Sequence, residues 1–440
     1  MPEKTVLMIA NLDTRGAEFA EFKELVMSQG LGALIMDVSM ELEPPFRGDI
    51  TCQEVAAAGG LSMDEVRVQY TAQRRISTDC MVRGGSLLAT ALLEQEKVHG
   101  VFGAGGATAT IIATSIMKAL PFGVPKVMAT PVAAIGCYVN HYVGTQDIAM
   151  VNTVVDVIGM NPMLRRGLAN GVGAVCGMVR MFPGIQALRR EQETGKPLIG
   201  VTCFGLAERS VERVLARLES VGFQPVAFHA QGKGDRAMDE LIRKGVVQGA
   251  VDLVPRGLGE ELLQGDGAAG PDRLSAAVEM GIPLVVAPGG FDQVSVGAQP
   301  EWRSRFGDRA FIVIDDARIE IRTSVEECVQ IARLLAARIN RAVAPVRVLV
   351  PVGGLSSLDR PGRALYGPEE DACLTRELTL DLVDGSIVEE LPYNLYDPEF
   401  GDACADAFLD VWVRSGRALP RVGETGGVGH GSGSGEDGVC

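Results

Sequence analysis

The sequence lacks the residue patterns that mark several common classes of protein. Aromatic residues make up only 5% of the chain, and its 440 residues include four histidines and nine cysteines. No two cysteines form a C-x-x-C pair and no histidines show the spacing H-E-x-x-H, so we expect reduced thiols and no structural zinc. No apolar stretch reaches transmembrane length without glycine or charge, so we expect a cytoplasmic protein that does not bind a membrane.

Positive charge is also scarce. The chain has 41 Lys and Arg against 56 Asp and Glu, which gives a net charge of −15. Since the phosphates of a nucleic acid need a basic surface, we expect no nucleic-acid partner. The P-loop spacing G-x-x-x-x-G-K-[ST] is missing, and the first strand loop lacks G-x-G-x-x-G, which argues against a nicotinamide-dependent oxidoreductase.

Glycine, in contrast, is abundant, and the chain is organised around one glycine-rich stretch. Of the 54 glycines, three lie in residues 103–106, within the sequence GVFGAGGATATIIAT. This order predicts a strand, a glycine turn and a helix, whose unpaired backbone N–H groups and dipole attract an anion, typically a phosphate. A tight turn that only closes a strand–helix unit is the alternative. The glycine spacing and the threonines inside the helix favour an anion site made by Gly103, Gly105, Gly106, Ala107 and Thr108.

Apolar, strand-like runs alternate with helical patterns along the chain. This alternation predicts an α/β fold with doubly wound parallel sheets. The pattern restarts after the polar sequence QETGK, so we place an N-terminal domain at residues 1–192 and a C-terminal domain at 197–413. The glycine-rich tail, residues 414–440, is predicted to be disordered. In the second half we expect parallel strands at residues 250–254, 283–287, 311–314 and 346–350.

Three segments of the first half depart from this alternation. Residues 41–79 are polar, with Pro-Pro and Gly-Gly pairs, and are predicted to form a flap over the site. Residues 131–147 are predicted to be an irregular loop with a functional role. The helix predicted over 164–181 is rich in small residues, so we expect it to pack closely at a homodimer interface or at the interdomain seam.

In the second half, polar side chains follow several predicted strands. His229 ends one strand and Arg236 begins the next helix, within the sequence HAQGKGDR. The glycines make this a second candidate anion loop. A histidine at such a strand end is a candidate general acid or base, although histidines with a structural role are more common.

Four more acidic and basic residues complete the predicted second cleft. Arg322 is a candidate for bidentate binding of a carboxylate substrate, and its alternatives are a helix cap or a pair with Glu326. Asp292 follows the sequence PGG, and the turn Asp315-Asp316 offers acceptors or a metal site. We place all of them at the carboxyl ends of parallel strands, where open α/β sheets bind ligands. The predicted catalytic set is His229, Arg236, Arg322 and Asp292.

Motifs spread over nearly the whole chain resemble one known family. LDTRG at 12–16, GVFGAGGATAT at 100–110, YVGTQD at 142–147 and VVDVIGMN at 154–161 are followed by FHAQGKGDRAM, PGGFDQV, IRTSVEE and LYDPEF. They are similar to landmarks of the ATP-binding domain family of the tomato mosaic virus resistance protein, whose bacterial members are mostly uncharacterised. The resemblance implies two Rossmann-like domains, ATP bound in the N-terminal one, and a homodimer.

With ATP as the implied ligand, the loop after the first strand supplies the other half of the site. A doubly wound sheet can bring two strand-end loops side by side, so we expect Asn11, Asp13, Thr14 and Arg15 to face the phosphates on the glycine turn. Asp13 is the candidate ligand for Mg²⁺, and the alternative is that it caps the following helix.

Two residues at other strand ends belong to the same predicted cofactor site. Asp37 ends the second strand, where a Rossmann-type fold places an acid for a ribose hydroxyl. A helix cap or turn residue is the alternative for this lone aspartate. Thr130 ends the strand PKVMAT, which follows the glycine turn and its helix.

The sequence also departs from the family pattern. Arg15 replaces a lysine, and Ala107-Thr108-Ala109 replaces a Ser-Gly-Gly run. We expect ATP binding to survive, because arginine also grips phosphate. In the second half, VPRG at 254–257 replaces Thr-Thr-x-Glu, and Asp315-Asp316 replaces His-Asn. These changes weaken any activity carried over from the family.

Two functions remain after these exclusions. The first is an ATP-dependent enzyme that carries out ligation or phosphoryl transfer on a small, carboxylate-bearing, anionic molecule in an interdomain cleft. The second is a non-catalytic ATP-binding protein that regulates or inhibits a partner. The polar residues kept in the predicted second cleft favour the enzyme.

Overall fold

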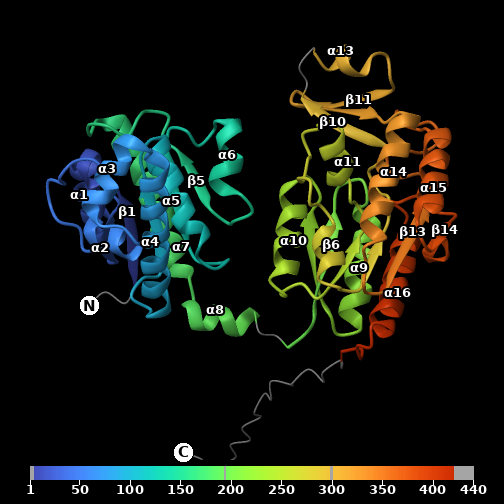
Figure 1. Ribbon diagram of the computed structural model, residues 1–440, viewed down its shortest axis with the longest axis horizontal. Coiled ribbons are helices and arrows are strands. Elements are labelled where there is room, and N and C mark those ends of the chain that lie inside the picture. Colours follow the sequence, from blue (N-terminus) through green and yellow to red (C-terminus); the bar gives the residue numbers. More distant parts are fainter. Residues whose placement is uncertain (1–3, 193–194, 298–300, 421–440) are drawn as a thin grey trace, which may run out of the picture. The chain divides into compact units, whose positions relative to one another are not determined.

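The computed structural model describes residues 4–192, 195–297 and 301–420. The chain divides into two compact units, with the division between residues 194 and 195. Each unit contains a parallel sheet with helices on both faces (Figure 1). This arrangement confirms the predicted α/β fold with two Rossmann-like domains.

The sheet of the first domain has five parallel strands in the order β2-β1-β3-β4-β5. The strands are β1 (Thr5–Ala10), β2 (Gly32–Asp37), β3 (Gly100–Ala104), β4 (Lys126–Thr130) and β5 (Ala149–Asn152). The direction in which strands are added reverses between β1 and β3. Loops that follow these two strands therefore border the crevice where such sheets bind ligands.

Helices cover both faces of this sheet. On one face, α1 (Leu12–Ser28) and α7 (Pro162–Met181) bury apolar side chains against the strands. The other face is covered by α2, α4 and α5, and residues of α3 and α8 belong to the same core. These other helices are α2 (Cys52–Ala58), α3 (Met63–Ala72), α4 (Arg74–Glu94), α5 (Ala107–Lys118), α6 (Gly136–Val143) and α8 (Ile185–Gln192).

The segment predicted as a flap and the segment predicted as an irregular loop both contain helices. The predicted flap at 41–79 holds α2 and α3, both of which begin with a complete capping box. Thr51 and Ser62 are the capping residues, and each is followed three residues later by a glutamate, a signal that the sequence carries plainly. The loop predicted at 131–147 contains α6, which is too short to show a clear helical period.

The glycines of α7 fall into two groups. Gly171 packs inside the domain, where an added Cβ would lie 3.2 Å from both Phe102 and Ala129. Gly173 and Gly177 face open space, with nothing within 4 Å of such a Cβ. Close packing within the domain thus accounts for part of the small-residue pattern. The homodimer stays a prediction.

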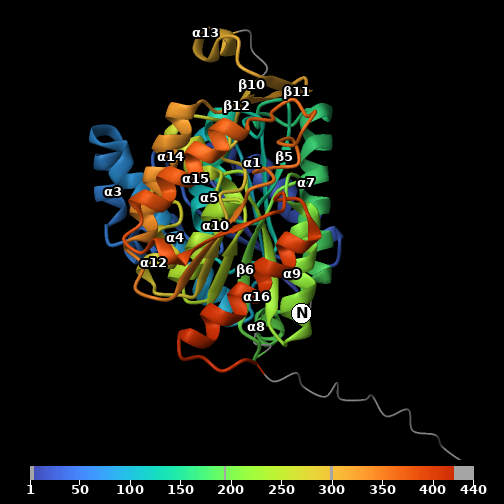
Figure 2. The ribbon, with the colours of Figure 1, turned by 90° about the vertical axis from the view of Figure 1, so that its right-hand side faces the viewer.

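The sheet of the second domain has six parallel strands in the order β14-β13-β9-β8-β6-β7. The strands are β6 (Leu198–Cys203), β7 (Gln224–His229), β8 (Gly249–Asp252), β9 (Leu284–Val286), β13 (Val346–Pro351) and β14 (Val388–Leu391). One face packs on α9 (Glu208–Ser220) and α16 (Pro398–Arg414). The other face is covered mainly by α10 (Lys233–Arg243), α11 (Gly257–Leu262), α12 (Ser275–Glu279), α14 (Val325–Ile339) and α15 (Pro368–Asp381), as Figure 2 shows for several of them.

A small antiparallel sheet was not foreseen. It consists of β10 (Gln293–Gly297), β12 (Arg318–Arg322) and β11 (Phe311–Asp315), and α13 (Trp302–Phe306) lies between β10 and β11 in the chain. The strand predicted at 311–314 exists, but it pairs with β12 in a hairpin and does not join the parallel sheet. A short apolar run of this kind occurs both in strands of a parallel sheet and in strands of a hairpin, so the sequence alone does not distinguish the two.

The first residues of the predicted disordered tail, 414–420, have a described structure. Arg414 ends α16, and the indole N–H of Trp412 donates to the carbonyl of Ala418 at 2.9 Å. Arg417 donates to the carbonyl of Gln248 at 2.6 Å. The rest of the predicted tail, from residue 421, lies outside the described residues. None of the described helices combines the length and apolarity needed to cross a bilayer.

Candidate functional site

The loops after β1 and β3 line one cavity in the first domain. Its volume is about 210 Å³. Its walls are Asn11, Asp13, Thr14, Arg15, Met40, Glu41, Tyr70 and Gly105 to Ala109. The structure therefore brings the first loop and the glycine turn together at the carboxyl edge of the sheet, at the point where the strand order reverses.

The glycine turn presents the beginning of α5 to this cavity. Gly105 has φ +144°, and an added Cβ would lie 2.5 Å from the Cβ of Ala109. Gly106 is the N-cap residue of α5, and the Ala107 and Thr108 side chains that follow are exposed. The N–H groups of a first helical turn have no partner within the helix, so they are available to an anion.

Asp13 ties the first loop to the loop after β2. Its Oδ2 accepts hydrogen bonds from the backbone N–H groups of Glu41 and Leu42, at 3.2 and 3.4 Å. The helix begins one residue earlier, at Leu12, and its N-cap Asn11 makes no side-chain cap. The capping alternative for Asp13 is therefore wrong. Oδ1 of Asp13 is buried and has no hydrogen-bond partner in the described part of the chain.

Arg15 lies beside Asp13 in an irregular turn of α1. Its backbone angles, φ −134° and ψ 24°, are not helical. Nη1 donates to the neighbouring carbonyl of Thr14 at 2.7 Å, and Nε has no hydrogen-bond partner among the residues that the structure describes. No acidic side chain among the described residues forms an ion pair with this guanidinium. A positive charge without a counter-ion therefore lines the cavity.

Asp37 does not line the cavity. It has the role given above as the alternative, that of a helix-cap or turn residue. The residue is 1% exposed, and its Oδ1 accepts from the backbone N–H groups of Leu12 at 3.3 Å and Ser39 at 3.0 Å. Burial raises the pKa of this carboxyl group. Asp37 thus fixes the start of α1 and the loop after β2, so the ribose assignment is wrong.

Gly103 and Thr130 also have structural roles. A Cβ on Gly103 would lie 2.8 Å from Ala113 and from Met128, so the absent side chain lets β3 pack against α5. Thr130 is fully buried, and its hydroxyl bonds that of Thr110 at 2.9 Å. Neither residue lines the cavity. Assignment of these two residues to the cofactor site is therefore not supported by their positions.

Four cavity residues were missed by sequence reasoning, and one of them, Ala109, directly follows the predicted Thr108. Met40 and Glu41 follow β2, the neighbour of β1, so their position could have been deduced from the strand order. Tyr70 comes from α3, inside the segment predicted as a flap. No spacing in the sequence indicates that its ring reaches the cavity.

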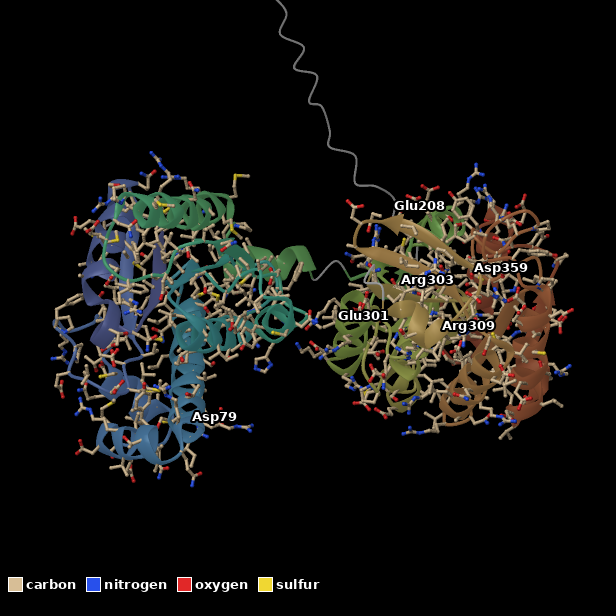
Figure 3. All side chains as sticks on the ribbon, turned by 90° about the horizontal axis from the view of Figure 1, so that it is seen from above. Asp79, Glu208, Glu301, Arg303, Arg309 and Asp359 are labelled. Carbon is tan, nitrogen blue, oxygen red and sulfur yellow. The ribbon has the colours of Figure 1, made fainter. Side chains whose placement is uncertain are left out.

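In the second domain, Arg322 is not available to a substrate. Its side chain is 5% exposed, and Nη2 lies 2.5 Å from Asp371 while Nη1 lies 3.5 Å from Asp359. The Arg322 charge also acts on the fully buried Asp292, which accepts from the Ser356 hydroxyl at 2.6 Å. Figure 3 labels Asp359 among the side chains of this domain. The guanidinium is thus held by the protein's own carboxyl groups, and Glu326 is not one of them.

His229 and Arg236 do not join this group. His229 ends β7, is exposed, and packs edge-on against the ring of Phe204 at 5.5 Å. Arg236 is exposed in the first turn of α10. No hydrogen bond, ion pair or ring contact between described residues links either of them to Arg322 or Asp292. The predicted single catalytic set is therefore not assembled in one place.

Asp315 and Asp316 lie in an exposed turn. They connect β11 to β12, and Asp315 forms an ion pair with Arg318 at 2.6 Å. This turn belongs to the antiparallel sheet and not to the carboxyl edge of the parallel one. No group of three or more potential metal ligands occurs among the described residues, so these two aspartates have no third ligand.

The buried acid Asp371 leads to a prediction about pH. Burial and a hydrogen bond with Asp359 raise the pKa of Asp371 to about 9, against an unfolded value of about 3.9. The folded state therefore binds this proton more tightly, and its contribution to stability is lost as the pH rises toward the folded pKa, by up to about 1.4 kcal/mol per pH unit. We expect the urea midpoint of unfolding to fall as the pH is raised above neutrality.

The matched variant is Asp371→Asn, whose neutral amide can keep the contact with Arg322. Its midpoint should fall less steeply over the same range. An equal fall in both proteins would show that Asp371 does not titrate in this way.

Comparison with known proteins places these features in a family. The uncharacterised protein family UPF0261 matches with its N-terminal domain at residues 4–183 and with its C-terminal domain at residues 196–412. A UPF0261 protein of Clostridium tetani is 33% identical over 93% of this chain and 99% of its own length. A UPF0261 protein of Rhizobium meliloti is 32% identical over the same shares of both chains.

The predicted resemblance to the plant protein is also found. The ToMV resistance protein Tm-1(GCR237) of Solanum lycopersicum is 34% identical over 73% of this chain, and the match spans 43% of the tomato protein. Both domains, and not a single motif, carry the similarity to the bacterial relatives. The chain therefore belongs to the UPF0261 family, which is related to the tomato Tm-1 resistance protein.

Proposed function

We propose that the first domain binds ATP and that the protein uses it in ligation or phosphoryl transfer on a small carboxylate-bearing molecule. One observation carries the proposal: the glycine turn and the first loop line one cavity at the point where the strand order reverses. The phosphates would lie on the backbone N–H groups of residues 105–108. Arg15 would face them with a charge that forms no ion pair with any carboxylate of the described residues.

The free oxygen of Asp13 supports a bound Mg²⁺. This Oδ1 is buried without a partner, and Mg²⁺ typically takes one or two carboxylates and completes its shell with phosphates and water. Asp13 would hold the ion, which would neutralise phosphate charge. With no ready cluster of three protein ligands in the described residues, the ion would arrive with the nucleotide.

The size of the cavity indicates which part of ATP it takes. At about 210 Å³ it is smaller than pockets that enclose a whole ligand, roughly 300–1,000 Å³. The cavity therefore suits the triphosphate, and the nucleoside would lie outside it. Tyr70 in the cavity wall offers an aromatic ring on which a base can stack.

Calorimetric titration of the full chain with ATP and Mg²⁺ tests the proposal. We expect saturable binding that weakens about tenfold or more in Arg15→Ala, since a charged hydrogen bond contributes roughly 1.5–3 kcal/mol. Arg166→Ala is the control, because Arg166 is exposed on α7 away from the cavity. Absence of binding, or equal affinity in Arg15→Ala, would contradict the proposal.

The alternative is an ATP-binding regulator or inhibitor of a partner. The printed name of the tomato relative, a virus resistance protein, is the observation that favours it. The two functions differ in turnover. An enzyme consumes ATP when its carboxylate substrate is present, whereas a regulator binds ATP with the same affinity and consumes none.

A further inference from the structure

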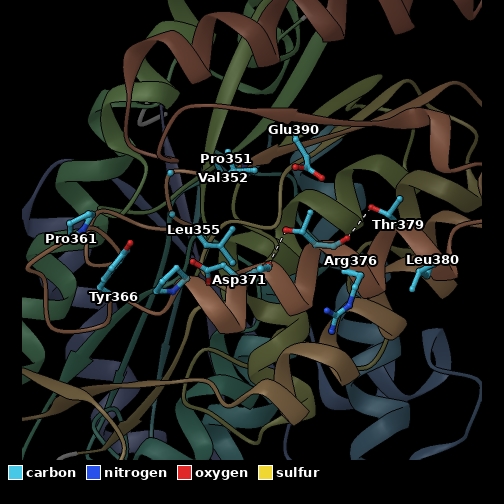
Figure 4. Close-up of a pocket in the computed structure, with 15 residues that line it drawn as sticks. Pro351, Val352, Leu355, Pro361, Tyr366, Asp371, Arg376, Thr379, Leu380 and Glu390 are labelled. Atoms are coloured by element: carbon cyan, nitrogen blue, oxygen red, sulfur yellow. Dashed lines mark hydrogen bonds between the residues drawn. The ribbon is translucent and has the colours of Figure 1, made fainter.

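A second, larger cavity lies in the second domain and is used by nothing described so far. Its volume is about 620 Å³, within the range of small-molecule sites. It lies beyond the carboxyl end of β13, between the loop at 351–355, the loop at 361–368, α15 and Glu390 of β14 (Figure 4). We call it the α15 groove. It occupies the edge of a parallel sheet at which ligands bind.

One wall of the α15 groove offers hydrogen-bond acceptors. Asp371, Thr375 and Thr379 follow one another at intervals of four along α15, so they form a row on one side of the helix. The Thr375 hydroxyl donates to the carbonyl of Asp371 and the Thr379 hydroxyl to that of Thr375, both at 2.9 Å. Their protons are thus used within the helix, and their oxygens are left to accept from a ligand.

Two opposite charges in the groove have no ionic partner. Glu390 is exposed on β14, and no cation of the described residues forms an ion pair with it. Arg376 is exposed on α15, and within the described part of the chain its guanidinium forms no ion pair and makes one weak hydrogen bond, of 3.4 Å to the sulfur of Cys373. Figure 4 shows Glu390 on β14 and Arg376 on α15 among the residues that line the groove. Glu389, the neighbour of Glu390 on β14, is in contrast paired with Arg347.

The rest of the lining is apolar and partly exposed. Tyr366, Val352 and Leu380 are 44%, 53% and 71% exposed, and Pro361 and Pro368 lie beside the tyrosine in the lining loop. Several large apolar side chains around one concavity mark a binding surface more clearly than scattered ones do. A ligand with an apolar body would remove this surface from water.

We propose that the α15 groove binds a small zwitterion of the amino-acid or dipeptide kind. Its carboxylate pairs with Arg376, its ammonium group with Glu390 and the threonine oxygens, and its apolar body lies on Tyr366 and Leu380. The inference deepens the proposed function, because it names the second, carboxylate-bearing molecule and assigns it to Arg376 in place of the occupied Arg322. It rests on the proposed function only for the reaction of the bound molecule with ATP, because binding of the zwitterion itself needs no ATP.

The test is binding of leucyl-phenylalanine to the full chain without nucleotide, measured by calorimetry. N-acetyl-leucyl-phenylalanine lacks the ammonium charge, and leucyl-phenylalanine amide lacks the carboxylate. We expect the dipeptide to bind saturably at millimolar concentrations or below and each derivative to bind about tenfold more weakly.

Two surface variants assign the two charges. Arg376→Gln should bind the dipeptide no more tightly than the unchanged protein binds the dipeptide amide. Glu390→Gln should bind the dipeptide no more tightly than the unchanged protein binds the N-acetyl form. Arg363→Gln and Glu369→Gln are matched controls, because both side chains are exposed in the described structure and neither lines the groove. All four changes are on the surface, so folding is retained.

Three outcomes would overturn the inference. They are no saturable binding of the dipeptide, binding of either derivative as tight as that of the dipeptide, and discrimination that persists in Arg376→Gln and Glu390→Gln. Failure of ATP binding in the first domain would leave each of these measurements unchanged. The two proposals therefore fail separately.

Discussion

Replacing Gly105 with valine is expected to abolish ATP binding to the first domain. Its φ of +144° is a conformation that side-chain-bearing residues rarely adopt, and a Cβ there would lie 2.5 Å from the Cβ of Ala109. The turn must shift to relieve this contact, and the shift moves the first N–H groups of α5 away from the phosphates. Loss of those hydrogen bonds together should lower the affinity by two orders of magnitude or more.

Calorimetry with ATP and Mg²⁺ measures the effect, and Gly30→Val controls for it. Gly30 also has a positive φ, +76°, but nothing lies within 4 Å of an added Cβ, and it follows the far end of α1. This variant carries a similar backbone strain with the cavity intact, so it should bind ATP like the parent. Unchanged affinity in Gly105→Val would show that the phosphates do not lie on this turn.

Replacing Arg273 with methionine is expected to destabilise the second domain by about 3–5 kcal/mol. Arg273 is 1% exposed and is the shared cation of three buried carboxylates. Nη2 lies 2.6 Å from Asp252, Nε 3.4 Å from Asp235 and Nη1 3.9 Å from Asp239. Without the guanidinium, these carboxylates repel one another away from water, whereas in the unfolded chain they are hydrated.

Urea unfolding measures this loss, and Arg213→Met is the control. Arg213 pairs with Asp402 at 2.9 Å, but about half of its side chain is exposed, so its loss should destabilise the protein much less. Burial raises the pKa of Asp239 to about 6 despite Arg273. The deficit of Arg273→Met should therefore shrink as the pH is lowered and the carboxylates take up protons. Equal destabilisation by the two variants would contradict a special role for the buried cluster.

The features that the sequence predicted correctly depend on residues that are close together in the chain. Two apolar strands, each followed by a loop and a helix, place Asp13 and Gly105 at the same sheet edge once the sheet is parallel. The glycine spacing marks the turn because only the local backbone is involved. Sequence motifs of this length also identified the family correctly.

What could not be predicted depends on neighbours distant in the chain. Arg322 looks like a free strand-end cation, yet the carboxyl group of Asp371, 49 positions later, occupies it. Asp37 has the right position for a ribose ligand, but Ser39 and Leu12 surround its carboxylate. Burial of a polar side chain is a property of the packed domain, and single-residue patterns do not contain it.

The strand orders of the two domains lead to a last conclusion. Counted within each domain, the first five parallel strands follow one sequence, 2-1-3-4-5. The loops after β6 and β8 thus correspond to the loops that line the cavity of the first domain. At that position the guanidinium of Arg256 lies 4.9 Å above the ring of Phe204, buried against Glu260 and Glu320. The two domains therefore share one strand order, with a glycine-lined crevice in the first and buried side chains at the equivalent position in the second.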